Sequence, residues 1–477
     1  MSYNNSGQQR NSKSLNRREF VQIVGMGGVA AFLAACRALP VQREPTPIQQ
    51  SAESATTLTF WTPGGSQAWC PIAITESMEA FTRANPNITF NEVQCGTGDQ
   101  NFREVLLARI AAGNPPDAVA LYVSPIALGA RGALVALDEM LPSSKYAQVE
   151  NWPPEVIASC QFNGKTWGLP VTIDTYGMWY NQEWFEEKGI PAEPEDFPKT
   201  WDELRSLSKE FTRWNDDYLE TAGFIPFRDA RELPIWSALN GGQIYNAAKQ
   251  KYMIDSEPNL AMMEYVVDWL DEEYKGDIGK VNASGYWGAY PGPQGQPPAF
   301  QEGRLATMLN GSWIMGDFYA SIEPRFTKWN VAPLPLGPMG TKVVSGYWPT
   351  WMAIPRGTQH VQEAFQWLDY VSGEGVRIWF EASPNLPANL SVPRDLVSPL
   401  LVEKRGETFA RQVTDFFLDQ LTIATPMWDS PIQSFAEDQL WRAIELITTK
   451  EAKPKDALTE AQRACQTELE NTLRRIS

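Results

Sequence analysis

The alternation of short apolar segments with helical patterns, early in the folded part of the chain, constrains the fold more than any other feature of this sequence. Segments 58–61, 88–93 and 118–122 have the length and apolar composition of buried strands. Between them, apolar residues recur at helical spacing over 74–81 and over 102–110. Strand, helix, strand, helix and strand joined by short connections are typical of a parallel sheet with helices on both faces. We therefore expect an α/β fold.

The segments that follow these strands carry aromatic and acidic residues. Ligands of open parallel sheets bind beyond the carboxyl ends of the strands. Trp69 follows the first strand, Asp99 follows the second, and Tyr122 closes the third. We therefore expect these three side chains to converge on one edge of the sheet, as candidates for a binding site.

The N-terminal segment has the features of an export signal. Basic residues precede an apolar stretch at about 21–35 that is too short to be a stable membrane span. Residues 16–20 resemble a twin-arginine export motif, and Leu33-Ala34-Ala35-Cys36 resembles a lipobox. We predict that residues 1–35 are an export signal peptide and that Cys36 is lipidated. The alternatives are a plain secretory signal or an uncleaved anchor.

The next segment, residues 36–56, is rich in Pro, Gln, Ser and Thr without an apolar period, and predicts a flexible tether. The formal net charge of the chain is −17, which disfavours binding to nucleic acid. A single histidine leaves no room for a His-rich metal site, and we expect neither a metal nor a cofactor. The 19 tryptophans exceed the 15 tyrosines, an excess that suggests a purpose beyond filling the core.

Four cysteines remain after Cys36, and none forms a CxxC pair. In an exported protein this even count permits two disulfides, with three connectivities open. Cys70 follows the first expected strand and Cys95 ends the second, so adjacent parallel strands would bring both to the same edge of the sheet. This favours a Cys70–Cys95 disulfide; buried free thiols are the alternative.

Short motifs in a fixed order resemble those of a known family. The chain resembles the bacterial extracellular solute-binding proteins of ABC importers, in particular the carbohydrate-binding group that includes maltose-binding protein. The motifs are Phe81-x3-Asn85-Pro86-Asn87-Ile88, AAGNPPD at 111–117, GLPV at 168–171, Trp179-Tyr180-Asn181 with Phe185 and the segment 198–204, and 299–308 leading to Gly311-Ser312-Trp313. Each motif is short, but their joint order over about 57–470 is specific.

The resemblance implies a two-lobed periplasmic-binding-protein fold with a hinge and an interlobe cleft. Lobe one would comprise 57–172 plus 350–415, and lobe two 173–349 plus 418–477. The chain would cross between the lobes near 170–176, 346–351 and 415–425. The chain is longer than is usual for the family, and residues 286–298, rich in Gly, Pro and aromatics, resemble an insertion near the cleft.

Physical chemistry leads to the same kind of ligand. A sugar presents apolar C–H faces on which aromatic rings stack, and a rim of hydroxyls that pair with carboxylates and amides. Residues of these types fall on loops and at strand ends, where a cleft needs them. The candidate ligand residues are Trp69, Asp99, Tyr122, Asp174, Tyr176, Trp236, Trp287, Trp313, Trp348 and Asn385.

Each candidate also has a purely structural interpretation. Trp313 matches the stacking tryptophan of the family and would otherwise fill the core. Asp174 and Tyr176 would otherwise make hydrogen bonds within the hinge. Trp236 and Trp287 would otherwise anchor loops. Trp179 and Trp201 belong to structural motifs and are expected in the core.

We therefore expect a monomeric, lipid-anchored receptor outside the cytoplasm that delivers a neutral sugar or oligosaccharide to an ABC permease, without catalysis. A lipid-anchored glycoside hydrolase with two catalytic carboxylates is the main alternative. A receptor for a polyol or glycerol phosphate is another; an anionic ligand would need convergent basic residues, and the basic residues near the expected cleft are Arg228, Arg231 and Arg304.

Overall fold

The described part of the structure belongs to the second of two units into which the chain divides, Met1–Ala52 and Glu53–Ser477. The computed structural model describes residues 55–64, 69–97, 99–226, 230–285, 287–289, 296–316, 324–425, 427 and 430–476. The side chains of 63–72 and 92–101 are outside this description. The predicted signal peptide, Cys36 and nearly all of the predicted tether also lie outside the described residues, so these predictions remain as they stand.

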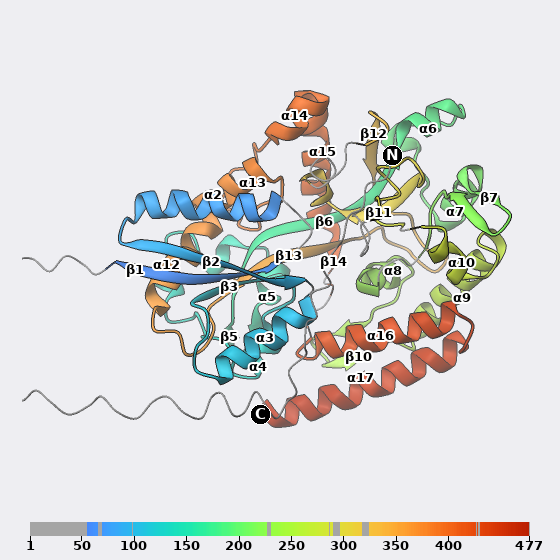
Figure 1. The fold of residues 1–477 in the computed structure, drawn as a ribbon. Helices are drawn as coiled ribbons and strands as arrows, with labels where there is room; N and C mark the ends of the chain where they lie inside the picture. Colours follow the sequence, from blue (N-terminus) through green and yellow to red (C-terminus); the bar gives the residue numbers. More distant parts are fainter. Residues whose placement is uncertain are drawn as a thin grey trace, which may run out of the picture. The chain divides into compact units, whose positions relative to one another are not determined.

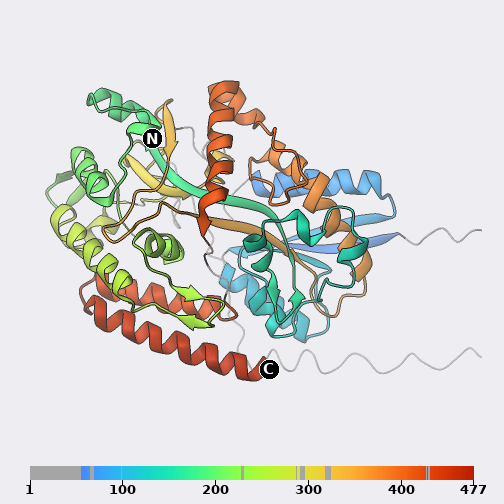
Figure 2. The same ribbon diagram turned by 180° about the vertical axis from the view of Figure 1, so that it is seen from behind.

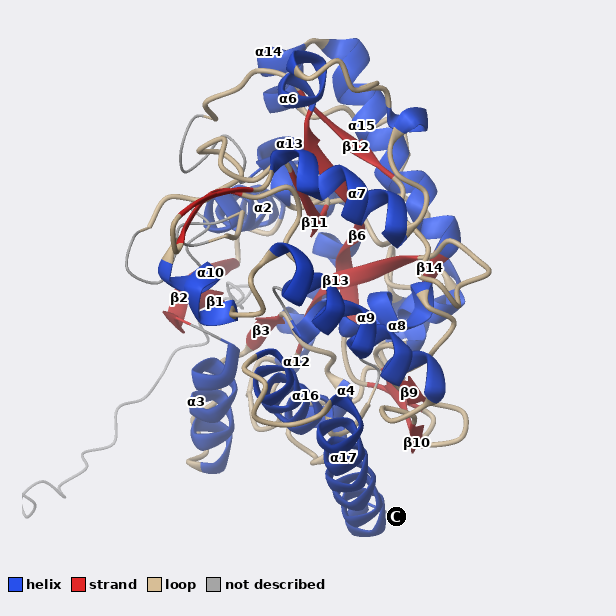
Figure 3. Cartoon of the chain, turned by 90° about the vertical axis from the view of Figure 1, so that its right-hand side faces the viewer, coloured by secondary structure: helices blue, strands red, loops and turns tan. Residues whose placement is uncertain are grey.

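A parallel three-stranded ladder begins the fold, as the alternating pattern predicts. Its strands are β1 (Thr56–Gly64), β2 (Ile88–Thr97) and β3 (Ala118–Leu121), and β1 pairs in parallel with both of the others. The helices α2 (Trp69–Ala84) and α3 (Asp99–Ala111) connect them and lie on opposite faces of the sheet (Figure 1 and Figure 3).

Neighbouring residues of β1 pack on opposite faces of this ladder, because side chains alternate along a strand. The ring of Phe60 lies 5.9 Å from that of Trp367, which also contacts Phe81 of α2. The ring of Trp61 lies 6.3 Å from that of Phe102 of α3. Both faces are therefore covered by apolar side chains, which confirms the prediction of a doubly covered sheet.

Two long strands continue this sheet and extend it to the rest of the molecule. They are β6 (Leu169–Asn181) and β13 (Ser345–Ala353), which pair with each other in antiparallel orientation. Within the described residues the sheet has eight strands, in the order β11-β6-β13-β3-β1-β2, with β12 paired to β6 and β14 paired to β13. The added strands are β11 (Thr307–Gly311), β12 (Trp329–Ala332) and β14 (Ala424–Thr425). Figure 1 shows β6 and β13 running between the helices around β1–β3 and those around α7 (Trp201–Phe211) and α9 (Glu257–Glu273).

The three segments predicted to cross between the lobes fall in the central sheet or next to it. The first, 170–176, falls in β6, and the second, 346–351, falls in β13. The third, 415–425, covers the end of α15 (Glu407–Gln420) and β14. Every residue of β6 is buried, so the strand lies in the core along its whole length. The exact boundaries of the two lobes stay a prediction.

Helices α16 (Gln433–Thr448) and α17 (Pro454–Ile476) run side by side within predicted lobe two (Figure 2). They pack against α9 (Glu257–Glu273), which in turn contacts α8 (Leu233–Leu239). Rings of Trp201 and Trp236 form the centre of this core, 4.9 Å apart. Trp179 and Trp201 are 0% and 1% exposed, which confirms their predicted place in the core.

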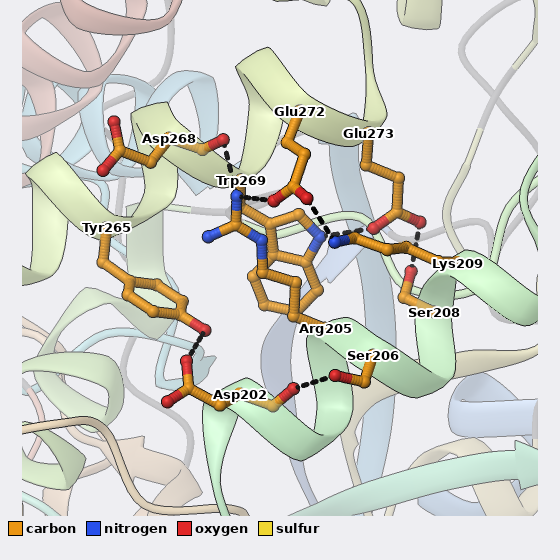
Figure 4. A network of polar contacts seen from close by, with 10 residues as sticks. All are labelled: Asp202, Arg205, Ser206, Ser208, Lys209, Tyr265, Asp268, Trp269, Glu272 and Glu273. Carbon is orange, nitrogen blue, oxygen red and sulfur yellow. Dashed lines mark hydrogen bonds and ion pairs between the residues drawn. The ribbon is translucent and has the colours of Figure 1, made fainter.

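A polar network joins α7 (Trp201–Phe211) to α9 (Figure 4). Thr200 caps α7 in a capping box with Glu203, which explains why the helix begins there. On the outer side, Glu272 pairs with Arg205 and with Lys209, the latter at 2.5 Å. On the inner side, Glu273 accepts a hydrogen bond from Ser208 at 2.5 Å. The two helices are thus joined by an exposed ion-pair cluster and by a buried carboxylate.

Short elements complete the described chain. Asn163 and Gly164 form a hairpin turn: both residues have positive φ, at 51° and 69°, and they join β4 to β5. The remaining strands are β4 (Gln161–Phe162), β5 (Lys165–Thr166), β7 (Arg213–Asn215), β8 (Tyr218–Thr221), β9 (Tyr245–Asn246) and β10 (Lys251–Tyr252). The remaining helices are α4 (Ile126–Ala130), α5 (Pro154–Ala158), α6 (Gln182–Glu187), α10 (Ile278–Ala283), α12 (Val361–Tyr370), α13 (Val376–Ala382) and α14 (Pro399–Arg405). Among the described residues, no helix combines the length and the apolar character that a membrane span requires.

Candidate functional site

The structure brings five of the predicted ligand residues to one place, where β6, β13 and the end of β11 meet. We call them the β6 cluster. They are Asp174, Tyr176, Trp313, Trp348 and Asn385. Asp174 and Tyr176 are two residues apart on β6 and therefore share one face of the sheet. In the β ladder, Trp348 lies opposite Asp174, and Gly311, two residues before Trp313, lies opposite Tyr176. Opposite residues of an antiparallel pair also share a face, so the cluster occupies one side of the central strands.

Asp174 is a buried carboxylate with a protein donor on each oxygen. It is 3% exposed. Its Oδ1 accepts a hydrogen bond from the hydroxyl of Ser312 at 2.7 Å, and its Oδ2 accepts one from Nδ2 of Asn385 at 2.9 Å. Burial raises the pKa of Asp174 to about 7, against the lowering effect of these two hydrogen bonds. Asp174 therefore joins β6 to the turn after β11 and to the loop after α13.

Asn385 is held in a fixed orientation by its own neighbours. Its Oδ1 accepts hydrogen bonds from the indole Nε1 of Trp379 at 3.1 Å and from the hydroxyl of Ser383 at 3.0 Å. These two donors direct Nδ2 of Asn385 toward Asp174. The loop itself follows β6, because Ile173 donates its N–H to the carbonyl of Leu386 at 2.7 Å. The amide is thus prearranged rather than free to rotate.

Trp313 and Tyr176 form the aromatic part of the cluster. Their ring centroids are 5.2 Å apart and their planes are nearly perpendicular, at 88°. Trp313 is half-buried, and so keeps part of its surface exposed. A Cβ atom on Gly311 would lie 2.1 Å from the indole of Trp313, so the indole occupies space that only glycine leaves open. The Gly-Ser-Trp motif therefore serves the position of the tryptophan directly.

A second aromatic pair stands beside the first on β13. Trp348 is half-buried, and its ring lies 6.5 Å from that of Trp351, which is buried. The indole Nε1 of Trp351 donates to the hydroxyl of Ser159 at 2.9 Å. Strand β3 pairs with β13 so that Leu121 lies opposite Trp351, and half-buried Tyr122 follows at this end of the sheet. One tryptophan of the Trp348/Trp351 pair is therefore core, and the other retains exposed surface.

Trp236 and Trp287 are not part of the β6 cluster. Trp236 is 2% exposed in α8 and packs against Trp201 and Phe224. Trp287 is 1% exposed; its Nε1 donates to the carbonyl of Val281 at 2.8 Å, and the guanidinium of Arg304 lies 4.6 Å above its ring. Their burial matches the structural interpretation, and a ligand contact for either stays a prediction without support from this geometry.

The tryptophan excess is explained mainly by the core, contrary to the expectation of a further purpose. Several of the largest fully buried side chains are indoles, and most of these pack against another aromatic ring. They are Trp179, Trp201, Trp236, Trp269, Trp287, Trp329, Trp367 and Trp379. Composition alone therefore overstates the number of tryptophans that remain available to a ligand.

Trp69 and Asp99 begin α2 and α3, directly after β1 and β2. Their backbone positions agree with the predicted edge of the sheet, and their side chains lie outside the described part of the chain. The same holds for Cys70 and Cys95, so the disulfide stays a prediction. Cys95 pairs with Pro63 in the ladder, close to the end of β1. Cys160 and Cys465 are buried free thiols.

Sequence reasoning missed the small polar residues that hold the cluster together. Ser312, Ser383 and Ser345 are each buried, and each binds a cluster residue or its backbone. Ser345, for example, donates its hydroxyl to the carbonyl of Tyr176 at 2.8 Å. A serine carries no periodic or compositional signal of its own. Only the position of Ser312 between Gly311 and Trp313 could have indicated its role.

Arg304, one of the basic residues that the sequence places near the expected cleft, is occupied by backbone contacts. Arg304 donates to the backbone carbonyls of Leu219, Glu220 and Ser284, so it is engaged in holding β8 and α10. Among the described residues, no group of three or more His, Cys, Asp or Glu side chains is placed to hold a metal ion. The accessible part of the cluster is the aromatic surface of Trp313 and Trp348, which suits the C–H faces of an uncharged sugar.

The fold and the cluster define a two-lobed binding protein of the periplasmic type, built on shared central strands. The chain belongs to the family described as "Bacterial extracellular solute-binding protein", whose sequence profile matches residues 76–403. The family is an extracellular one, and its members are binding proteins. The predicted family, fold class and extracytoplasmic location are therefore confirmed at this level.

Known proteins with similar sequences or structures agree with this assignment. An arabinooligosaccharide-binding protein of Bacillus subtilis (strain 168) is 22% identical over 323 residues, which is 67% of this chain and 69% of that protein. A maltooligosaccharide ABC transporter solute-binding lipoprotein of Streptococcus pneumoniae (strain R6) is 24% identical over 58% of this chain and 61% of its own length. The structure of CpMnBP1 with mannotriose bound superposes with a TM-score of 0.70 at 18% identity, over 86% of this chain and 99% of that one. Maltose-bound MalE3 of T. maritima gives 0.68 at 18% identity, over 87% and 99%.

Proposed function

We propose that this chain is a lipid-anchored receptor outside the cytoplasm that binds a neutral sugar or oligosaccharide between its two lobes and delivers it to an ABC permease. The β6 cluster is the observation that carries the proposal. Half-buried Trp313 and Trp348 offer aromatic faces of the kind that stack on sugar C–H surfaces, next to the carboxylate and amide of Asp174 and Asn385.

The relatives support the choice of ligand class. Their names refer to arabinooligosaccharides and maltooligosaccharides, and the similar structures contain mannotriose or maltose. A neutral ligand is favoured over an anionic one because Arg304 is already bound to three backbone carbonyls. Delivery to a permease, the lipid anchor and a monomeric state follow from the family and the N-terminal motifs, and belong to the proposal.

A thermal-shift screen of the mature chain against mono- and oligosaccharides, with glycerol phosphate and a polyol included, tests the ligand class. We expect at least one neutral sugar to raise the melting temperature in proportion to the logarithm of its concentration, as a ligand of the native state does. The Trp313→Ala variant should lose most of this shift. A response to glycerol phosphate alone, or to no sugar in a broad panel, contradicts the proposal.

The hydrolase alternative is tested in the same samples. A glycoside hydrolase needs two carboxyl groups on either side of the scissile bond, whereas the β6 cluster holds one. We expect no release of reducing ends from any oligosaccharide that raises the melting temperature. Steady release that disappears in Asp174→Asn would instead establish an enzyme.

A further inference from the structure

A buried glutamine joins helix α16 to the loop that follows β3. Gln433 and Ser124 are each 1% exposed and lie 309 residues apart in the sequence. The backbone N–H of Ser124 donates to Oε1 of Gln433 at 3.2 Å. On its other side, Nε2 of Gln433 donates to Oε1 of Glu437 at 2.7 Å, one turn further along α16. Both ends of the glutamine amide are therefore engaged.

Ser124 lies in predicted lobe one and is connected to β13 through hydrogen bonds. The hydroxyl of Ser124 donates to the carbonyl of Ser159 at 2.7 Å and accepts from the N–H of Ile126 at 3.2 Å. The hydroxyl of Ser159 in turn accepts the indole N–H of Trp351 at 2.9 Å. The loop is thus fixed to the strand that carries Trp348 of the β6 cluster.

Gln433 lies in predicted lobe two. Helix α16 packs along α17 and against α9, and α17 also contacts β10. At the start of α16, the N–H of Gln433 donates to the carbonyl of Ser430 at 3.0 Å. The hydroxyl of Ser430 accepts a hydrogen bond from Tyr252 of β10 at 2.6 Å. The N-terminus of α16 is therefore fixed to elements that all fall within predicted lobe two.

We propose that Gln433 is a positioning residue for ligand binding: its hydrogen bond to Ser124 spans the two lobes and favours the closed form. The inference rests on the proposed function, in which the lobes move relative to each other. Two groups that are buried here would both return to water when the lobes separate, so their bond contributes to the closed form alone. A net contribution typical of a neutral hydrogen bond changes the ratio of closed to open molecules about five-fold.

Small-angle X-ray scattering of the ligand-free protein tests this without any knowledge of the sugar. In Gln433→Met the side-chain volume is nearly kept while the acceptor for Ser124 is lost. We expect a larger radius of gyration than in the wild type, in line with a population of open molecules about five-fold higher relative to closed ones. Hydrogen exchange at peptides covering 122–126 should become faster in the same variant.

Gln462 supplies a matched control. Its Oε1 accepts the N–H of Ile254 at 2.7 Å and its Nε2 donates to the carbonyl of Tyr252 at 2.9 Å, so it loses equivalent bonds within one lobe. Gln462→Met should lower the melting temperature and leave the radius of gyration unchanged. If Gln433→Met does not fold, Glu437→Ala removes the acceptor that orients the Gln433 amide, and should expand the protein in the same direction by less.

An unchanged radius of gyration in Gln433→Met, or in Glu437→Ala where that variant is used, overturns the proposal. Equal expansion in Gln462→Met overturns it as well, because the effect would then be general loosening. Expansion confined to the Gln433 variants supports it. This outcome is independent of the sugar screen: a protein that binds no sugar but expands in Gln433→Met would refute the ligand class and leave the contact between lobes established.

Discussion

Asp174 combines nearly complete burial with a titratable side chain at the junction of three segments. An ionised carboxyl group is expensive to remove from water, and hydrogen bonds from Ser312 and Asn385 offset part of that cost. The raised pKa of about 7 records the part that remains. The residue therefore makes the stability of the molecule dependent on pH close to neutrality.

We predict that the free energy of unfolding falls as the pH rises from about 4 to about 7. Over that range the folded protein keeps a proton on Asp174 that the unfolded chain has released, because burial raises the pKa from 3.8 to about 7. The full effect is at most about 4 kcal/mol. Urea unfolding at pH 4 and pH 8 measures it, and Asp174→Asn, which cannot ionise, should reduce the difference. An equal pH dependence in both proteins contradicts the assignment to Asp174.

Trp313 is the residue on which we expect sugar affinity to depend most. Trp313→Ala removes the partly exposed ring that packs edge-on against Tyr176, and should weaken binding by about 1–3 kcal/mol while the fold stays intact. Calorimetry with the best sugar from the thermal-shift screen measures the loss. Trp441, which is 42% exposed on α16, provides the control, since Trp441→Ala should bind normally. Equal affinities in all three proteins would remove Trp313 from the site.

At the residue scale, the sequence predicts the role of a residue within a local motif better than the side chains that will pack around it. Trp313 was identified by the Gly-Ser motif before it, and the structure gives that motif a steric reason. Trp236 and Trp287 were expected in irregular segments, yet both are buried, and Trp236 packs against Trp201, which is distant in the sequence. Trp201, for example, precedes Trp236 by a long segment that contains two strands. No local pattern reveals that kind of partner.

Helices α7 and α9 are joined by two glutamates, one in exposed ion pairs and one in buried hydrogen bonds (Figure 4). Glu272 and Glu273 are adjacent in the sequence, but the first points outward to Arg205 and Lys209 and the second inward. Glu273 accepts hydrogen bonds from Ser208, from Thr212 and, at 2.7 Å, from the indole of Trp269. Burial raises the pKa of Glu273 despite these donors. The inner contact is thus the desolvated one.

We predict a large difference in stability between the two alanine variants. Glu273→Ala leaves buried donors without their acceptor and should cost about 3 kcal/mol, whereas Glu272→Ala breaks exposed ion pairs and should leave stability nearly unchanged. Chemical denaturation compares the two, and sugar binding should survive in both because the network lies apart from the β6 cluster. Similar losses of stability would mean that the outer ion pairs matter as much as the inner carboxylate.

At the element scale, regular patterns were predicted well and irregular joins were not. Segments 58–61, 88–93 and 118–122 correspond to β1, β2 and β3, because a buried strand between two helices has a recognisable length and composition. The crossings near 170–176 and 346–351 came from the family resemblance and fall in β6 and β13. The pairing of these two strands depends on residues far apart in the sequence, and periodicity says nothing about such pairing.

For the whole molecule, we predict that sugar binding makes the protein more compact. A ligand that contacts both lobes stabilises the closed form. From a ligand-free protein with comparable open and closed populations, reaching an open-to-closed ratio of 1:99 requires about 2.7 kcal/mol of differential affinity. Several stacked rings and neutral hydrogen bonds at about 1 kcal/mol each suffice for this. Small-angle scattering with saturating sugar should give a smaller radius of gyration. An unchanged profile, with binding demonstrated in the same sample, would mean that occupancy is not signalled by closure.

The N-terminal prediction also concerns the molecule as a whole. Because Cys36 follows Leu33-Ala34-Ala35, Cys36→Ser should release the protein from the membrane fraction or block its maturation. Cell fractionation with detergent partitioning measures this, and Cys465→Ala, which changes a buried thiol far from the signal, should remain in the membrane. Normal processing and membrane retention of Cys36→Ser would argue against a lipoprotein.

Because β13 lies between β3 and β6, the central sheet can be completed only late in the synthesis of the chain. Both neighbours leave the ribosome long before β13 does, and each then presents an open edge with unpaired backbone groups. Neither half of the molecule can complete its sheet until Ser345–Ala353 has been made, so the halves mature together and not one after the other. A nascent chain that stalls before this strand exposes two unpaired strand edges, both of which can pair with other chains. Quality control during synthesis therefore matters more for this architecture than for two domains strung in sequence, and crossing the membrane only after folding would suit it.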